Sequence, residues 1–457
     1  MFVIKPGNFK FTLLILFYTV ISCNKEEDKI FEHISFPAEV YFDKFDENVD
    51  LSISNSGSET LWLTITFNEV VNFRNEIETM QILQAGGILD LPLTLNRLMI
   101  DEELFQTKIQ IYIPAIDRLV EVPVRVKSVL PEYINLDFNI IDAVYYENDN
   151  EIIAISTQPE NTLLRIDPIN GDIDKVPLNS KPLSLHVNAD IQKAAIGQTD
   201  RYTVVDLNSN SITKESQTEI SINPIFMPNE EWLYAIREDY SNLYVIDLLT
   251  GEATYENYSD HLKIEFHPHH ENYLLINNTR VHPSLMEVYD FSNRSMSKLY
   301  ESSRGDDERD VHGNFWITKD NNWIISKGRC LFTCSPNHED DVNFVKMLDG
   351  GKFISSLCHL NNTGNIATIN RNNRLGSSDE NSIAFYDDSQ FNLIGKFPLP
   401  VYYSEGSSEA SESTEGKFIF RNNQQDKLFL LMTNDYITTE DNKWALLIYD
   451  TNKLFDN

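Results

Sequence analysis

The chain has 457 residues, of which 41% are hydrophobic, and a formal net charge of -33 at pH 7. This hydrophobic share is high enough to build folded cores, and the length allows about two or three ordinary domains. The negative charge argues against nucleic acid as a partner, because few basic groups are available to neutralise phosphates. Twenty tyrosines and 26 phenylalanines favour strands over helices.

The N-terminal segment has the pattern of an export signal. Lys5 and Lys10 accompany a run of about ten largely apolar residues, 11–20, which is too short to span a bilayer. The sequence Val20-Ile-Ser-Cys23 then resembles a bacterial lipobox. This resemblance implies that residues 1–22 are a signal peptide and that Cys23 becomes the lipidated N-terminus. The alternative is an ordinary signal peptide in which Cys23 is incidental.

Residues 23–30 form a charged tether in this interpretation. Its sequence Asn24-Lys-Glu-Glu-Asp28 resembles the signal that sends some Gram-negative lipoproteins to the outer face of the outer membrane. We therefore expect an outer-membrane lipoprotein that contacts the membrane through Cys23 and is exposed at the cell surface. The periplasmic face is the alternative.

Residues 31–128 contain short alternating strands separated by turn residues. In 51–65, two such strands flank a Ser-Asn-Ser-Gly-Ser turn, where Asn55 and Gly57 are expected to supply positive φ angles. About seven such runs in about 95 residues predict a small β-sandwich. Segment 53–65 resembles immunoglobulin-like modules of the BACON and abnormal-spindle/Hydin types. The resemblance implies an immunoglobulin-like β-sandwich that serves as a spacer or adhesion module.

From residue 130 to residue 457 a unit of about 40 residues repeats. The third strand of most units ends in an aliphatic residue or tyrosine followed by aspartate, at Asp167, Asp206, Asp247, Asp290, Asp387 and Asp450. The fifth unit lacks this aspartate. Counting first strands gives seven units, which begin near Ile141, Leu183, Pro224, Ile264, Gly313, Ile354 and Lys417.

Seven four-stranded units predict a seven-bladed β-propeller, because no unit can bury both faces of its sheet alone. The last unit stops after three strands, and segment 133–138 is expected to supply its fourth strand and close the ring. The repeats resemble the YVTN/YncE-like family over about 320 residues, on turns such as Phe226-Met-Pro-Asn and Phe266-His-Pro-His. The expected fold is therefore all-β. The resemblance leaves the function open, because propellers host many unrelated activities.

Most arginines of the repeat region fall in loops that are expected to share one rim. The candidate ligand-binding residues on this rim are Arg201, Arg237, Tyr240, Arg280, His282, Arg304, Arg309, Arg329, Arg371 and Arg374. Arginine forks and aromatic faces suit carboxylates, sulfates and sugar rings. The alternative is that these arginines pair with neighbouring acidic residues as ordinary surface.

Two groups of side chains invite a metal interpretation, but we predict no metal and no cofactor. His267, His269 and His270 lie in a turn on the opposite rim, and adjacent turn residues rarely converge on one ion. Cys330, Cys334 and Cys358, with His359, lack the spacing of a structural zinc site, and core packing accounts for them. Three cysteines cannot all pair, so a disulfide scaffold is excluded.

The sequence contains no nucleophile elbow, zinc-protease motif, Walker loop or dinucleotide fingerprint. We therefore expect a lipid-anchored binding or scaffold protein whose propeller rim recognises a glycan, a peptide or an envelope protein. The alternative is a propeller hydrolase or lyase acting on an anionic saccharide or lactone, because such sites take one residue from each blade. Carboxylates or histidines that converge with the arginines at the channel mouth would favour the enzyme.

Overall fold

The computed structural model describes most of the chain beyond the N-terminal segment. The described residues are 29–46, 48–68, 70–73, 79–237, 242–257, 261–278, 285–292, 297–302, 311, 313–350, 353–360, 364–371, 381–400, 414–433 and 444–455. The signal peptide, Cys23 and most of the tether lie outside them. Among the described residues, no helix has the length and apolar character needed to cross a bilayer.

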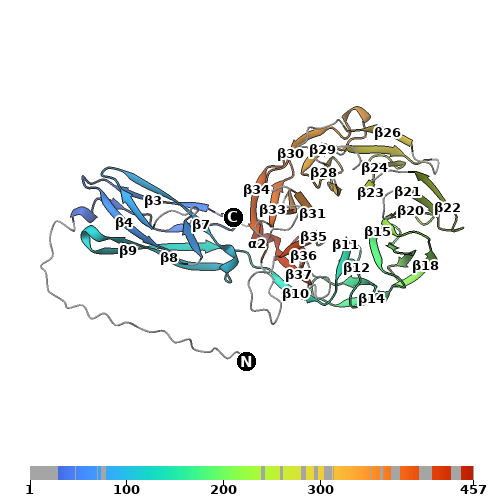
Figure 1. The fold of residues 1–457 in the computed structure, drawn as a ribbon, viewed down its shortest axis with the longest axis horizontal. Coiled ribbons are helices and arrows are strands. Elements are labelled where there is room, and N and C mark those ends of the chain that lie inside the picture. The colour runs from blue at the N-terminus through green and yellow to red at the C-terminus, as the bar shows by residue number, and fades with distance from the viewer. Residues whose placement is uncertain are drawn as a thin grey trace, which may run out of the picture. The chain divides into compact units, whose positions relative to one another are not determined.

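The chain divides into two compact units, both built almost entirely of strands (Figure 1). The first unit comprises Met1–Tyr41, Asn48–Leu95 and Gln106–Arg125. The second comprises Val126–Asn457 together with two shorter segments, Phe42–Glu47 and Asn96–Phe105. The second unit therefore includes two short segments that precede its main stretch in the sequence.

The strands of the first region form two antiparallel sheets. One has the order β1 (Ile34–Ser35), β3 (Asn48–Asn55), β7 (Ile88–Leu95) and β5 (Val71–Phe73). The other has the order β2 (Val40–Phe42), β9 (Arg118–Lys127), β8 (Leu104–Ile113), β4 (Leu61–Thr66) and β6 (Met80–Leu83). Strand β4 buries alternate residues, as expected for a sheet with one face in a core. Short 3-10 turns, η1 (Arg97–Met99) and η2 (Pro114–Ile116), flank β8.

The turn between β3 and β4 differs from the sequence prediction. Neither Asn55 nor Gly57 has a positive φ. Instead, the Asn55 side chain accepts a hydrogen bond from the Gly57 N–H at 2.9 Å and donates to the Glu59 carbonyl at 2.7 Å. A Cβ on Gly57 would lie 3.2 Å from the Cβ of His33. The glycine therefore favours close packing here rather than a left-handed backbone.

The described part of the second unit contains seven four-stranded antiparallel sheets. The first sheet contains β11 (Ile140–Tyr146), β12 (Glu151–Ser156), β13 (Thr162–Ile166) and β14 (Ile173–Pro177), and the second contains β15 (Pro182–Asn188), β16 (Lys193–Gln198), β17 (Arg201–Asp206) and β18 (Ser211–Gln217). The third contains β19 (Ile222–Phe226), β20 (Trp232–Arg237), β21 (Asn242–Asp247) and β22 (Ala253–Asn257), and the fourth contains β23 (His261–Phe266), β24 (Tyr273–Asn278), β25 (Leu285–Asp290) and β26 (Ser297–Glu301). The fifth contains β27 (Phe315–Ile317), β28 (Trp323–Ser326), β29 (Cys330–Thr333) and β30 (Phe344–Met347), and the sixth contains β31 (Phe353–Leu360), β32 (Asn365–Arg371), β33 (Ser382–Asp387) and β34 (Leu393–Pro398). The seventh has the order β10 (Glu132–Leu136), β37 (Trp444–Asp450), β36 (Lys427–Thr433) and β35 (Glu415–Arg421). Two short helices, η3 (His338–Asp340) and α2 (Thr451–Phe455), complete the unit.

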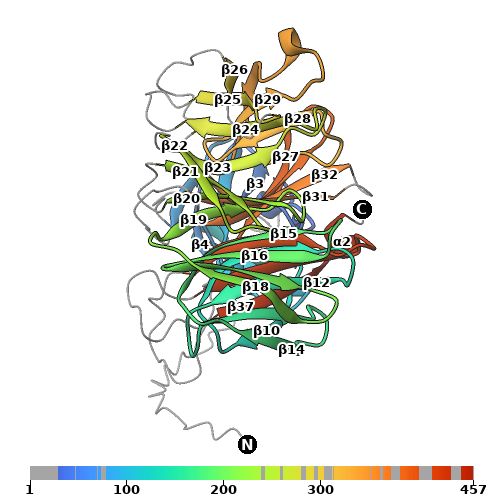
Figure 2. The same cartoon turned by 90° about the vertical axis from the view of Figure 1, so that its right-hand side faces the viewer.

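These sheets are arranged in a ring (Figure 1). In the first six sheets the first strand in chain order lies on the inside and the fourth on the outside, whereas in the seventh β35 lies on the inside and β10 on the outside. Seen from the side, the strands run roughly along the ring axis (Figure 2). Strand β12 explains why the ring forms. Ile153 and Ile155 pack against the following sheet, whereas Ile152 and Ala154 pack against the seventh. All four side chains are fully buried, so this sheet needs a neighbour on each face.

The repeated aspartates end the third strands by a local interaction. In each of the six, a carboxylate oxygen accepts the backbone N–H two or three residues further along, at 2.6 to 3.0 Å. This geometry is an Asx turn, for which aspartate is well suited. The fifth sheet instead connects β29 to β30 through a longer loop that contains η3.

Strand β10 closes the ring, as predicted. It pairs antiparallel with β37, from Glu132 opposite Ile448 to Leu136 opposite Trp444. The first strand in this half of the chain is therefore joined to the last. Because the chain continues directly from β10 into β11, both ends of the ring are held in adjacent sheets.

We predict that Leu136→Ala destabilises the ring by about 2–5 kcal/mol, because Leu136 is 3% exposed and packs in the core between the first and seventh sheets. Urea unfolding of the full chain measures this loss. Glu132→Ala, an exposed position in the same strand, is the control and should change stability by less than about 0.5 kcal/mol. Equal stability of the two variants would show that β10 does not close the ring.

Candidate functional site

The first strands of the seven sheets surround a cavity of about 530 Å³. Every one of these strands, β11, β15, β19, β23, β27, β31 and β35, contributes lining residues. The volume falls within the range of ordinary ligand pockets, about 300–1,000 Å³. This central cavity is the candidate functional site.

A recurrent irregularity turns polar side chains toward this cavity. In six of the seven sheets the pairing of the first strand with the second shifts register, for example between Ile140 and Asp142. Such a bulge adds a residue to one strand and re-aims the side chains beside it. Strand β27 is the exception, because it pairs with β28 without a shift.

Side chains near the bulges connect several sheets to the sheet that follows. Asp142 accepts a hydrogen bond from the Leu185 N–H at 3.0 Å. Lys263 donates to the Phe315 carbonyl at 2.7 Å, and Ser356 accepts from the Ile419 N–H at 3.0 Å. The polar groups of the cavity wall therefore also hold the ring together.

The acidic and basic side chains of Asp142, His186, Lys263 and Glu265 line the cavity. The Lys263 ammonium lies 3.1 Å from a Glu265 carboxylate oxygen and 5.7 Å from the centre of the Trp316 ring. This arrangement combines an ion pair with a cation–π contact. It leaves one lysine and two carboxylates facing a space of ligand size.

The cavity shifts the pKa values of two of these groups. Burial raises the pKa of Asp142 to about 6, although the N–H groups of Leu185 and Ala143 and the Lys263 charge oppose the shift. Burial lowers the pKa of His186 to about 4, with Glu265 opposing and Lys263 adding to the shift. The His186 Nδ1 atom accepts the Met227 N–H at 3.3 Å. At neutral pH the imidazole is therefore uncharged and carries its proton on Nε2.

Aromatic rings form another part of the cavity wall. Phe418 and Phe420 are stacked, with ring centres 6.2 Å apart and planes 9° apart, and Tyr145 stacks on Phe420 at 6.3 Å. Trp316 is half-buried and lines the cavity as well. The site thus offers flat apolar faces beside a few charged groups, the usual composition of a ligand pocket.

Of the rim residues that sequence analysis selected, the four described arginines do not line this cavity. Arg201 pairs with Asp200 at 3.1 Å and Glu215 at 3.4 Å, and Arg371 pairs with Glu415. Arg329 donates to the Leu348 carbonyl, and Arg237 ends strand β20. Tyr240, Arg280, His282, Arg304, Arg309 and Arg374 lie outside the described residues.

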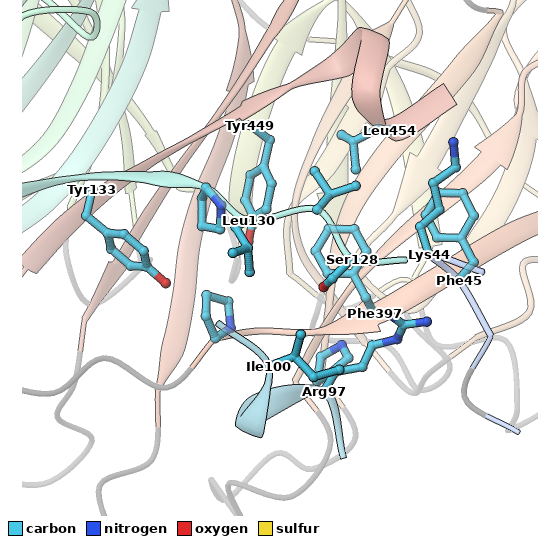
Figure 3. A pocket seen from close by; sticks show the side chains of 14 residues that line it. Lys44, Phe45, Arg97, Ile100, Ser128, Leu130, Tyr133, Phe397, Tyr449 and Leu454 are labelled. Atoms are coloured by element: carbon cyan, nitrogen blue, oxygen red, sulfur yellow. The ribbon is translucent and has the colours of Figure 1, made fainter. Parts of the chain in front are cut away.

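A smaller cavity of about 140 Å³ lies elsewhere in the second unit (Figure 3). Its lining is mostly apolar and includes the aromatic rings of Phe45, Tyr133, Phe397 and Tyr449. The guanidinium of Arg97 also lines it but donates to the carbonyls of Asp46 at 2.8 Å and Lys127 at 3.1 Å. Its one arginine is thus engaged with backbone, which makes this cavity a weaker candidate.

A second polar cluster joins His267, Cys334 and Asp341, all of which are buried. The three turn histidines do not meet at one point, because His269 contacts the Asn321 carbonyl and His270 the Pro336 carbonyl. Burial, with a contribution from Asp341, raises the pKa of the Cys334 thiol to about 12. None of Cys330, Cys334 and Cys358 forms a disulfide. In the sequence, His267 and Cys334 belong to two separate groups of residues, and Asp341 follows a loop without a recognisable motif.

Comparison with known proteins identifies the fold alone. No family model matches the chain, and neither does any curated protein sequence. Among solved structures, the β-propeller domain of Cps50 (Swd1) from Myceliophteria thermophila is similar, with a TM-score of 0.50 and 11% sequence identity. The match covers 69% of this chain and 99% of that domain. The ring of sheets is therefore a β-propeller, a fold too widely used to indicate a function.

The two shifted groups should give opposite pH dependences of stability. Asp142 has a folded-state pKa above its unfolded value, so its contribution to stability falls as the pH rises from about 4 to 6. His186 has a folded-state pKa below its unfolded value, so its contribution rises with pH from about 4 to 6.5. We compare each variant with the unmodified protein as the pH rises from 4 to 6.5. We predict that the free energy of unfolding of Asp142→Asn increases by up to ~2 kcal/mol relative to that of the unmodified protein, and that the free energy of unfolding of His186→Gln decreases by up to the same amount.

Urea unfolding between pH 4 and 6.5 measures both differences. The comparison is of slopes, because each substitution also removes hydrogen bonds and lowers stability at every pH. Curves for the two variants that run parallel to that of the unmodified protein would contradict the assignment.

Proposed function

We propose that this protein is a lipid-anchored binding protein of the cell surface whose propeller binds a saccharide in its central cavity. The observation that carries the proposal is the cavity of about 530 Å³, to which the first strands of all seven sheets contribute. Stacked rings such as Phe418 and Phe420 provide flat faces for sugar rings. Lys263, Asn223 and Asn314 provide hydrogen-bonding groups for hydroxyls or a carboxylate.

In this proposal the seven four-stranded sheets are the seven blades of one propeller. The first unit is an immunoglobulin-like β-sandwich that acts as a spacer, which its two antiparallel sheets and the alternating burial of β4 support. The acyl groups on Cys23 hold the protein at the outer membrane. The support for this anchor is the lipobox-like sequence Val20-Ile-Ser-Cys23.

A hydrolase or lyase is the second candidate, because Asp142 and His186 share the cavity and have shifted pKa values. Their contacts favour binding instead. Asp142 accepts N–H groups from Ala143 at 2.9 Å and Leu185 at 3.0 Å, and His186 accepts one from Met227. Both groups are thus engaged in holding strands in place, and a His186 pKa of about 4 is poorly matched to proton transfer at neutral pH.

We predict that a glycan array probed with the full-length protein yields ligands whose binding depends on the cavity. Lys263→Met and Trp316→Ala should each raise the Kd about tenfold or more, because they remove a charged group and a ring face from the wall. Arg201→Ala is the control, since Arg201 lies outside the cavity, and its Kd should be unchanged.

Calorimetric titration measures these constants, and thermal unfolding confirms that each variant is folded. Binding that is lost in Arg201→Ala but retained in the two cavity variants would place the ligand elsewhere. Turnover of a bound saccharide that is abolished in Asp142→Asn would favour the enzyme.

For the anchor, we predict that Cys23→Ala abolishes incorporation of labelled fatty acid and releases the protein from the membrane fraction. Protease treatment of intact cells then separates surface exposure from a periplasmic location. Acylation that persists in Cys23→Ala would contradict the lipobox assignment.

A further inference from the structure

We propose that His267, Cys334 and Asp341 form a binding site for one zinc ion, which joins the fourth and fifth sheets of the propeller. The site is separate from the central cavity, since none of the three residues lines it. The proposal is therefore independent of the proposed function.

The three side chains present one nitrogen, one sulfur and one oxygen toward a common point. The possible ligand atoms all lie within 4.8 Å of one another, and the Nε2 atom of His267 is 2.9 Å from the Asp341 Oδ2 atom. The side chains of His267 and Asp341 are both fully buried, and Cys334 is 4% exposed. Ligand atoms around a tetrahedral ion with bonds of about 2.0–2.3 Å lie about 3.3–3.6 Å apart. Binding therefore requires the Nε2 and Oδ2 atoms to separate slightly from their present 2.9 Å.

The donor set discriminates among metals. An imidazole, a thiolate and a carboxylate suit zinc, whereas magnesium and calcium take oxygen ligands almost alone. The Tyr300 hydroxyl donates to the same Asp341 oxygen at 2.9 Å and helps to hold it in place. A water molecule would complete four-fold coordination.

Neighbouring groups hold the ligands in position. The second Asp341 oxygen, Oδ1, accepts the Ser335 N–H at 2.8 Å, which fixes the carboxylate so that Oδ2 faces His267. The Thr333 hydroxyl donates to the Asp340 carbonyl at 2.5 Å and ties the end of the loop to strand β29. Such outer contacts orient ligands at metal sites and raise the affinity.

Binding of zinc changes two protons in the cluster. Without metal, His267 Nδ1 accepts the His269 N–H at 3.3 Å, so Nε2 carries the proton and donates to Asp341. When Nε2 binds zinc, the imidazole stays neutral and its single proton moves from Nε2 to Nδ1. The protonated Nδ1 can no longer accept the His269 N–H, so that long contact is lost. The Cys334 thiol loses its proton to solvent as the sulfur–zinc bond forms. One proton is thus released for each ion, and no oxidant or reductant is needed.

The experiment uses the full-length chain without an affinity tag, stripped of metal by a chelator and dialysed. Isothermal titration with zinc chloride should show one ion per chain, and cobalt(II) should give a near-ultraviolet sulfur-to-cobalt charge-transfer band. Cys334→Ser should abolish this band and weaken zinc binding at least 100-fold, and Asp341→Asn should weaken it at least tenfold. Cys330→Ala and Cys358→Ser are the matched controls and should retain both the band and the affinity.

Zinc should also raise the unfolding temperature of the unmodified protein and of the two control variants, but not that of Cys334→Ser. Failure of the unmodified protein to bind zinc, or a cobalt spectrum without the sulfur band, would overturn the proposal whatever the stability of the variants. Unchanged binding in Cys334→Ser would overturn it as well.

Discussion

The second unit depends on one packing constraint, which is that its sheets are apolar on both faces. Ile152 to Ile155 in β12 are all fully buried, with alternate side chains in contact with different neighbouring sheets. A sheet of this kind is stable only between two others, and a row of such sheets leaves two exposed faces unless it closes on itself. The pairing of β10 with β37 removes those ends. The central cavity follows from closure, because the first strands must then surround a common axis.

The parts of this fold that sequence analysis predicted depend on local interactions. The repeated aspartates are visible in the sequence because each bonds to a backbone N–H only two or three residues away. Closure by residues near 133–138 was also predictable, since the last unit lacked one strand. The cavity was not. Asp142, His186 and Lys263 come from three different sheets, and the bulges beside Asp142 and Lys263 leave no trace in the hydrophobic pattern.

The candidate arginines were chosen by residue type and by their place in loops. Neither criterion takes account of the acidic or backbone group with which each side chain interacts. Arg201 pairs with Asp200, its neighbour in the sequence, so the ordinary ion-pair interpretation was available from the beginning. Arg371 pairs with Glu415 of the following sheet, which no local rule predicts. Lys263 was overlooked because it lies within a strand, although its contacts with Glu265 and Trp316 place it at the cavity wall.

The fifth sheet departs from the repeat at two places, and each departure accompanies a polar cluster. Its first strand, β27, lacks the bulge of the others, and there the Phe315 carbonyl receives the Lys263 ammonium. Its third strand lacks the terminal aspartate, and a longer loop follows. Asp341 in this loop forms a hydrogen bond with His267 of the fourth sheet. A repeat is maintained because each unit satisfies the same packing requirement. A unit that departs from the repeat pattern at one position therefore has a specific interaction there in place of the repeated one. In this chain both such interactions join the fifth sheet to the fourth.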